Sequence, residues 1–178
     1  MRDIKDVAKY VGISMISKGL TVSPLKLQKM LYYVQAWYMV FFGRENTLFE
    51  DIPEAWVNGP VYPVIYHIYK DKVSGMFDNL RLSDFTDIKD EESAFRMISN
   101  KMAFTKDEEE FIDSVITLYG SKSENELVLY THIEKPWSEK REGLKPYENS
   151  NEKLSLDTIY NYYRSRHKRN QEKYETAN

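Results

Sequence analysis

The chain has 178 residues, of which 42% are hydrophobic and 30% charged, a balance that suits one globular domain with its own core. A net charge of −3 lacks the basic excess of a general nucleic-acid-binding protein and fits a basic protein partner. The absence of cysteine excludes disulfides, thiolate catalysis and thiolate metal sites.

Neither a signal peptide nor a membrane span is predicted. The first residues, MRDIKDVAKYVGIS, include acidic side chains and no continuous apolar run. No apolar run approaches the roughly 20 residues that cross a bilayer. We therefore expect a cytoplasmic protein without a membrane partner.

Two helices are predicted at the start of the chain. Asp3 caps the first, which ends near Gly19. Its apolar residues recur at helical spacing: Ile4, Val7, Ala8, Val11 and Met15. Ser23 and Pro24 start the second, which ends at Gly43. Its second half, AWYMVFF, is apolar nearly all round, so we expect this helix (about 23–43) to be buried at the centre of the domain.

A sharp corner is predicted within EAWVNGPVYPVIY, residues 54–66. Leu48–Phe49 and Ala55–Val57 are extended candidates, and Asn58-Gly59 is a strong turn dipeptide. Pro63 fits the first turn of a helix that follows. At most one small hairpin is therefore expected, near residues 48–58.

The rest of the chain is predicted to be helical. One helix covers Glu92–Met102, and Thr105 and Ser123 each start a capping box. Pro136 is expected to end the segment that follows Ser123, and a last helix begins near Leu156. The fold class is therefore mainly α, a single domain of about seven helices. Residues 1–165 are expected to form it, and residues 166–178 a charged, frayed tail.

No catalytic, cofactor or metal site is predicted. The three histidines lie far apart in the sequence, and His132 and Glu134 diverge on a helix, which makes a zinc site improbable. G-x-S-x-G and G-x-x-x-x-G-K motifs are absent. A hydrolase or nuclease therefore remains only a weak alternative.

Two features have both a structural and a functional interpretation. The basic run from Arg164 to Arg169 is either a favourable charge at a helix C-terminus with a solvated tail, or a contact for an acidic partner or phosphates. The rings of Trp56, Tyr62 and Tyr66 either pack inward around the turn or form an aromatic patch for a partner.

Three ordered motifs make the chain resemble the Panacea domain of SocA-like antitoxins, a group that includes phage-associated proteins. They are a K-L-L-Y-Y-A-Q-like helix, an E-A-W-x-x-G-P-V corner and a T-H-x-E-x-P-W-like segment, here at Lys29–Gln35, Glu54–Val61 and Thr131–Trp137. The likeness covers about residues 5–165. Met30 and Asn58 depart from the family pattern, which leaves the fold unaffected but bears on the choice of partner.

The resemblance implies a non-enzymatic antitoxin that neutralises a protein toxin, encoded by an adjacent gene, through direct binding. Two alternatives are a proteolytic adaptor that delivers its toxin to a ClpXP-type protease, and a phage accessory protein that binds a host factor. DNA binding is not expected. The candidate partner-binding residues are Trp56, Asn58, Gly59, Pro60, Val61, Tyr62, Tyr66, His132 and Trp137.

Overall fold

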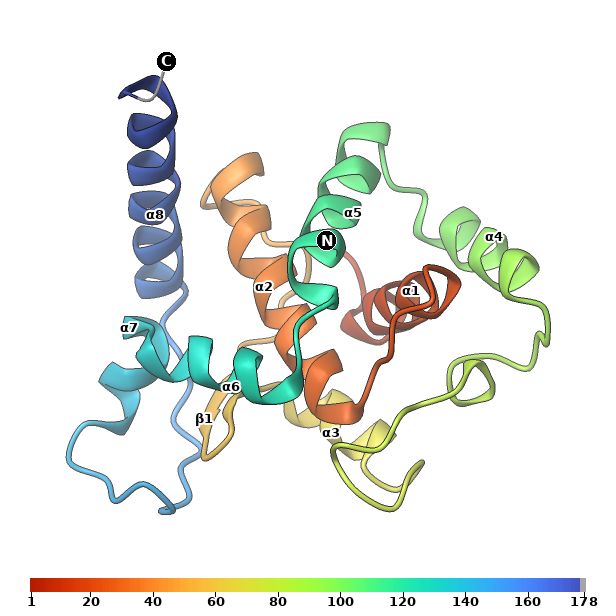
Figure 1. Cartoon of the computed structure of the whole chain (residues 1–178), viewed down its shortest axis with the longest axis horizontal. Helices are drawn as coiled ribbons and strands as arrows, with labels where there is room; N and C mark the ends of the chain where they lie inside the picture. Colours follow the sequence, from red (N-terminus) through yellow and green to blue (C-terminus); the bar gives the residue numbers. More distant parts are fainter. Residues whose placement is uncertain (177–178) are drawn as a thin grey trace.

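The central element of the computed structural model, which describes residues 1–176, is helix α2 (Pro24–Phe42). Every residue from Pro24 to Met39 is buried. Helices α1 and α5 pack on α2 from one side and α8 from the other, while the hairpin and α3 lie near its first turns (Figure 1). The expectation of a buried central helix over residues 23–43 is therefore confirmed.

Eight α-helices and one two-stranded antiparallel hairpin make up the described chain. Two single turns of 3₁₀-helix, Leu82–Asp84 and Glu139–Arg141, accompany them. The elements are α1 (Ile4–Ser17), α2, β1 (Glu54–Trp56), β2 (Gly59–Val61), α3 (Pro63–Tyr69), α4 (Glu91–Met102), α5 (Lys106–Gly120), α6 (Glu124–Ile133), α7 (Lys135–Ser138) and α8 (Leu156–Thr176). Within residues 1–176 no helix is long and apolar enough to cross a membrane.

The helix starts follow the capping signals in the sequence. Asp3 accepts a hydrogen bond from the backbone N–H of Lys5, and Ser23 accepts one from Lys26. Thr105 and Ser123 each form a complete capping box with the glutamate three residues later. The predicted starts of these four helices are therefore confirmed.

Three local predictions differ from the structure. The hairpin spans residues 54–61 rather than 48–58, because the chain returns directly after the turn at Val57–Asn58. Pro136 does not end the helical region, since it lies in the first turn of the short helix α7, where a missing N–H has no cost. The expected frayed tail is helical through Thr176, and residues 177–178 lie outside the described part.

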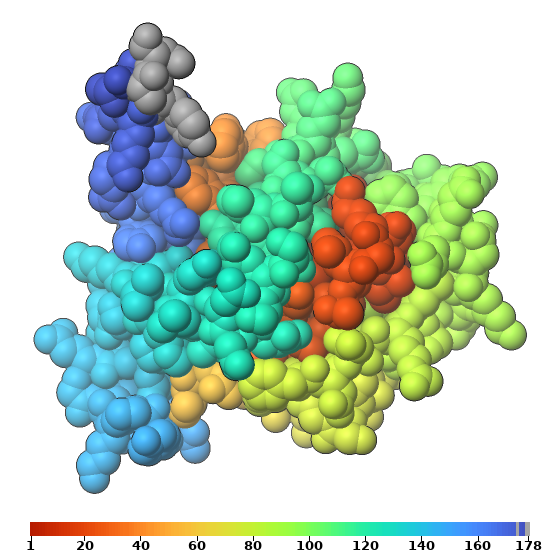
Figure 2. All heavy atoms as spheres, viewed as in Figure 1, coloured from red at the N-terminus to blue at the C-terminus, as the bar shows by residue number. Residues whose placement is uncertain are grey.

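The second half of α8 extends beyond the body of the protein. Figure 1 shows α8 running past the end of α2, and Figure 2 shows it standing out from the surface. Its first half carries the buried residues Ile159 and Tyr163, which pack on the core. Only part of this helix is therefore needed to complete the domain.

Gln35 on α2 holds Leu48 and Phe49, which the sequence predicts to be extended but which lie in a bend that belongs to no strand. Its amide nitrogen donates to the carbonyl oxygen of Phe49 over 2.8 Å, and its amide oxygen accepts from the N–H of Leu48 over 2.9 Å. Leu48 and Phe49 are both buried. The side chain thus satisfies two buried backbone groups of the bend, which no β-ladder reaches.

Replacing Gln35 with Met is expected to destabilise the protein by about 2–4 kcal/mol, because two buried backbone groups lose their hydrogen bonds. Urea unfolding followed by circular dichroism measures the change. Gln171→Met, at an exposed position of α8, is the matched control and should change the free energy of unfolding by less than about 0.5 kcal/mol. Equal effects from the two substitutions would contradict the role of Gln35.

Candidate functional site

The corner between β1 and β2 depends on a glycine at a crowded position. Gly59 has a φ angle of +97°, which L-residues rarely adopt. A Cβ atom there would lie 2.5 Å from Oγ1 of Thr131 and 2.6 Å from Nζ of Lys29. Both the backbone conformation and the space therefore require glycine, and the corner meets α2 and α6 at this point.

Lys29 fixes the corner from inside the protein. Its side chain is fully buried, and Nζ donates a hydrogen bond to the carbonyl oxygen of Pro60 over 3.0 Å. Burial disfavours the charged amine and lowers the pKa of Lys29 to about 7. Gln28, the preceding residue, pairs with the backbone of Tyr62 through both amide atoms, at 2.8 and 3.3 Å.

One side chain of the late motif and another that follows it donate hydrogen bonds to carbonyl groups of β1. Nε1 of Trp137 donates to the carbonyl oxygen of Trp56 over 2.9 Å, and Nη1 of Arg141 donates to that of Ala55 over 2.9 Å. The ring of His132 stacks on Trp137, with centroids 4.0 Å apart and planes inclined by 7°. This edge of the hairpin is therefore closed by the protein itself.

Glu134 joins the late motif to α2 and α8. Its Oε2 accepts from the hydroxyl of Tyr163 over 2.7 Å and from that of Tyr32 over 3.2 Å. Nη1 of Arg166 lies 3.5 Å from Oε1. Burial raises the pKa of Glu134 to about 7, while the hydroxyl groups and Arg166 oppose the shift. The residues around Glu134 and Lys29 thus connect all three sequence motifs.

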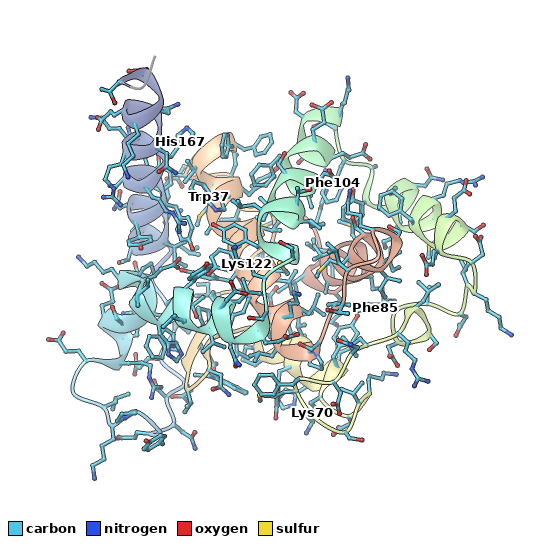
Figure 3. The ribbon with its side chains drawn as sticks, viewed as in Figure 1. Trp37, Lys70, Phe85, Phe104, Lys122 and His167 are labelled. Carbon is cyan, nitrogen blue, oxygen red and sulfur yellow. The ribbon has the colours of Figure 1, made fainter. Side chains whose placement is uncertain are left out.

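The outward side of the corner forms an open groove of about 740 Å³, which we call the corner groove. The rings of Trp56 and Tyr66 meet edge to face with centroids 4.9 Å apart, and Nε1 of Trp56 donates to Glu54 over 2.7 Å. The groove is lined by Pro24, Leu25, Gln28, Glu54, Trp56, Val57, Asn58, Val61, Tyr66, Lys70, Ser74, Gly75, Met76 and residues 149–151. Figure 3 shows Lys70 at the lower end of the molecule, beyond α3.

The predicted partner-binding residues divide into two groups. The groove is lined by four of them: Trp56, Asn58, Val61 and Tyr66. The other five do not line it: Gly59, Pro60 and Tyr62 are buried, Trp137 donates to the carbonyl of Trp56, and His132 stacks on Trp137. The structure therefore makes these five part of the framework that holds the corner.

Other groove residues gave no clear signal in the sequence. Leu25 and Gln28 belong to the predicted central helix, so the sequence pattern assigns their side chains to the packing of that helix and not to a groove. Met76 and residues 149–151 come from turn-rich and polar loops. Only the tertiary structure brings these loops to the corner. Within residues 1–176, no three His, Asp or Glu side chains are grouped so that they could hold a metal ion.

Replacing Gly59 with Ala is expected to destabilise the protein by at least about 2 kcal/mol, through the positive φ angle and the contacts with Thr131 and Lys29. Gly19→Ala is the matched control, since Gly19 has a φ angle of +70° but no atom within 4 Å of an added Cβ. Its cost should be only about 1 kcal/mol. Chemical unfolding of both variants measures the difference, and equal costs would mean that crowding at the corner is unimportant.

The buried amine is expected to make stability depend on pH. The pKa of Lys29 is about 7 in the folded protein and near its ordinary 10.5 in the unfolded chain. The unfolded chain then binds the proton more tightly, so the free energy of unfolding should rise between pH 7 and 10.5, by up to about 1 kcal/mol per unit. Lys29→Met should remove this slope in urea unfolding measured across that range. Parallel slopes for the wild type and Lys29→Met would show that the pH dependence does not come from Lys29.

Comparison with known proteins assigns the family. The family model described as "Antitoxin SocA-like, Panacea domain" matches residues 27–138, which include all three motifs. Antitoxin SocA of Caulobacter vibrioides (strain NA1000 / CB15N) is 29% identical over 136 residues, covering 76% of this chain and 68% of that protein. No solved structure matches. The chain therefore belongs to the SocA-like antitoxin family with the Panacea domain.

Proposed function

We propose that this protein is an antitoxin that neutralises a protein toxin by binding it directly, and that the corner groove receives a segment of the toxin. The observation that carries the proposal is that the family's E-A-W-x-x-G-P-V motif lines this groove with Trp56, Asn58 and Val61. The buried residues of the same motif hold these side chains in place.

The groove has the properties of a preorganised binding site. The carbonyl of Pro60 is fixed by Lys29, and the backbone of Tyr62 is fixed by Gln28, so β2 and the residue after it lose little conformational freedom on binding. The rings of Trp56 and Tyr66 restrain each other. Rigid aromatic side chains beside polar groups are typical of residues that dominate binding energy.

The chemistry of the groove favours a mainly apolar segment with few charges. Leu25, Val61 and Met76 provide apolar surface, and Asn58 provides an amide. The carboxylate of Glu54 already accepts from Trp56. Lys70 lies with Nζ 5.9 Å from the centre of the Tyr66 ring. A carbonyl or carboxylate group of the partner could therefore accept a hydrogen bond from the amine of Lys70.

A second candidate is a proteolytic adaptor that brings the toxin to a ClpXP-type protease. The observation that favours it is a second exposed feature, the charged half of α8, at the opposite end of α2 from the groove. Deleting residues 164–178 should then leave toxin binding intact and lengthen the half-life of the toxin. An unchanged half-life would exclude this role for the segment.

Groove variants are expected to abolish neutralisation without unfolding the domain. The protein is co-expressed with each adjacent gene, and growth and co-purification are scored. Where a neighbour is toxic alone and rescued by the wild type, Asn58→Arg and Tyr66→Ser should each weaken binding by at least about tenfold, because one fills the groove and the other removes an aromatic contact. Melting temperatures of the purified variants test folding.

His67→Ser is the matched control, since His67 neighbours Tyr66 but is exposed and does not line the groove. It should retain both rescue and co-purification. Full rescue by folded Asn58→Arg would overturn the groove as the toxin-binding site. If neither neighbour is toxic and nothing co-purifies, the antitoxin function itself fails, and a phage accessory protein that binds a host factor becomes the better explanation.

A further inference from the structure

A second hollow lies at the opposite end of α2, between α5 and α8. Figure 2 shows the last turns of α2 at the back of this hollow, with the two other helices standing on either side. Phe41 is 57% exposed there, and its ring lies 5.6 Å from that of Phe111 on α5 and 5.0 Å from that of His167 on α8. Trp37 lies one turn deeper, and Figure 3 shows it facing His167.

Apolar surface continues along the α5 side of the hollow. Leu118 is 56% exposed and lies seven residues after Phe111, which places both on the same side of α5. Phe111 also contacts Phe42 and Tyr38 with its ring. We call the surface formed by Trp37, Phe41, Phe111, Leu118 and His167 the α5–α8 notch.

A basic stripe borders the notch on α8. Arg166, Arg169 and Lys173 follow at the i, i+3, i+7 spacing that places side chains on one side of a helix. The stripe starts on the side that faces α6, because Nη1 of Arg166 lies 3.5 Å from Glu134 at the end of that helix. Arg164 and Lys168 share the opposite side of α8.

The projecting half of α8 is polar on every side and would gain stability from a partner. Residues 164–173, RSRHKRNQEK, contain no apolar residue. A short helix that is polar on every side is only marginally stable in water by itself. The chain as a whole carries −3, so these cations are concentrated on an otherwise acidic protein.

We propose that the α5–α8 notch binds an acidic amphipathic helix of a protein partner, whose apolar side packs on Phe41 and Leu118 and whose carboxylates pair with Arg166, Arg169 and Lys173. A helix fits a channel between two helices above a third, where side chains can interdigitate. A nucleic acid fits less well, because its phosphates would meet an apolar floor and an acidic body.

The notch is independent of the corner groove. The two surfaces lie at opposite ends of α2, whose 19 residues span about 28 Å. Both can therefore be occupied at once, and the notch does not depend on the antitoxin function.

The proposal is tested with fluorescein-labelled probes and fluorescence anisotropy on the full chain. The main probe is a model helix of about 18 residues with leucine on one side and glutamate elsewhere. A second peptide has lysine in place of glutamate, a third has serine in place of leucine, and a fourth probe is a DNA duplex. We expect the acidic amphipathic peptide to bind at least about tenfold more tightly than the other three probes.

Two double variants with the same change of charge distinguish binding at the notch from general electrostatic attraction to α8. Arg169→Glu/Lys173→Glu reverses the stripe beside the notch, and Arg164→Glu/Lys168→Glu reverses the other side of the same helix. The first pair, and Phe41→Ser, should weaken binding of the acidic peptide by at least about tenfold, and the second pair by less than about twofold. Circular dichroism at 222 nm verifies α8 in each variant.

Equal losses in the two charge-reversed variants would overturn the proposal, because attraction would then be spread around α8. Preferential binding of the duplex would overturn it in favour of a nucleic-acid partner. Wild-type affinity in folded Phe41→Ser would also overturn it, since the apolar floor would then make no contribution.

Discussion

The hydrogen bond from the buried amine of Lys29 to the carbonyl of Pro60 is the contact around which the rest of the structure is arranged. It brings the hairpin against α2 at Gly59, a position with a positive φ angle and no room for a Cβ atom. A buried lysine with a pKa near 7 is costly, so the contact persists only because the surrounding core holds it in place. The corner is therefore fixed at the expense of stability, a cost typical of functional positions.

In the core, the hydroxyl groups of large aromatic rings form hydrogen bonds with a few other buried polar groups. Tyr33 and Tyr119 stack with centroids 3.9 Å apart, and the hydroxyl of Tyr119 accepts from Nε1 of Trp37 over 3.0 Å. The hydroxyls of Tyr32 and Tyr163, in contrast, donate to the carboxylate of Glu134. Because each ring fills space and also carries a hydroxyl group, the core can hold ionisable residues that determine how α2, the hairpin and α8 fit together.

The two ends of α2 differ in chemistry, and this separates the two proposed surfaces. At its start, Leu25 and Gln28 form part of a groove with little net charge. At its end, Phe41 is exposed between an apolar side of α5 and the basic stripe of α8. Partners of different charge are therefore expected at the two ends, with a rigid helix between them.

Local patterns in the sequence determined the helices, their caps and the central position of α2, because capping and hydrophobic periodicity act over a few residues. They also determined the family motifs and the sharp turn at Gly59. Tertiary structure alone decided that Tyr62 is buried and Tyr66 lines a groove, and that Leu48–Phe49 pairs with Gln35 instead of a strand. It also brought residues 149–151 to the corner. These outcomes depend on contacts between residues far apart in the chain, and the spacing of neighbouring residues carries no information about them.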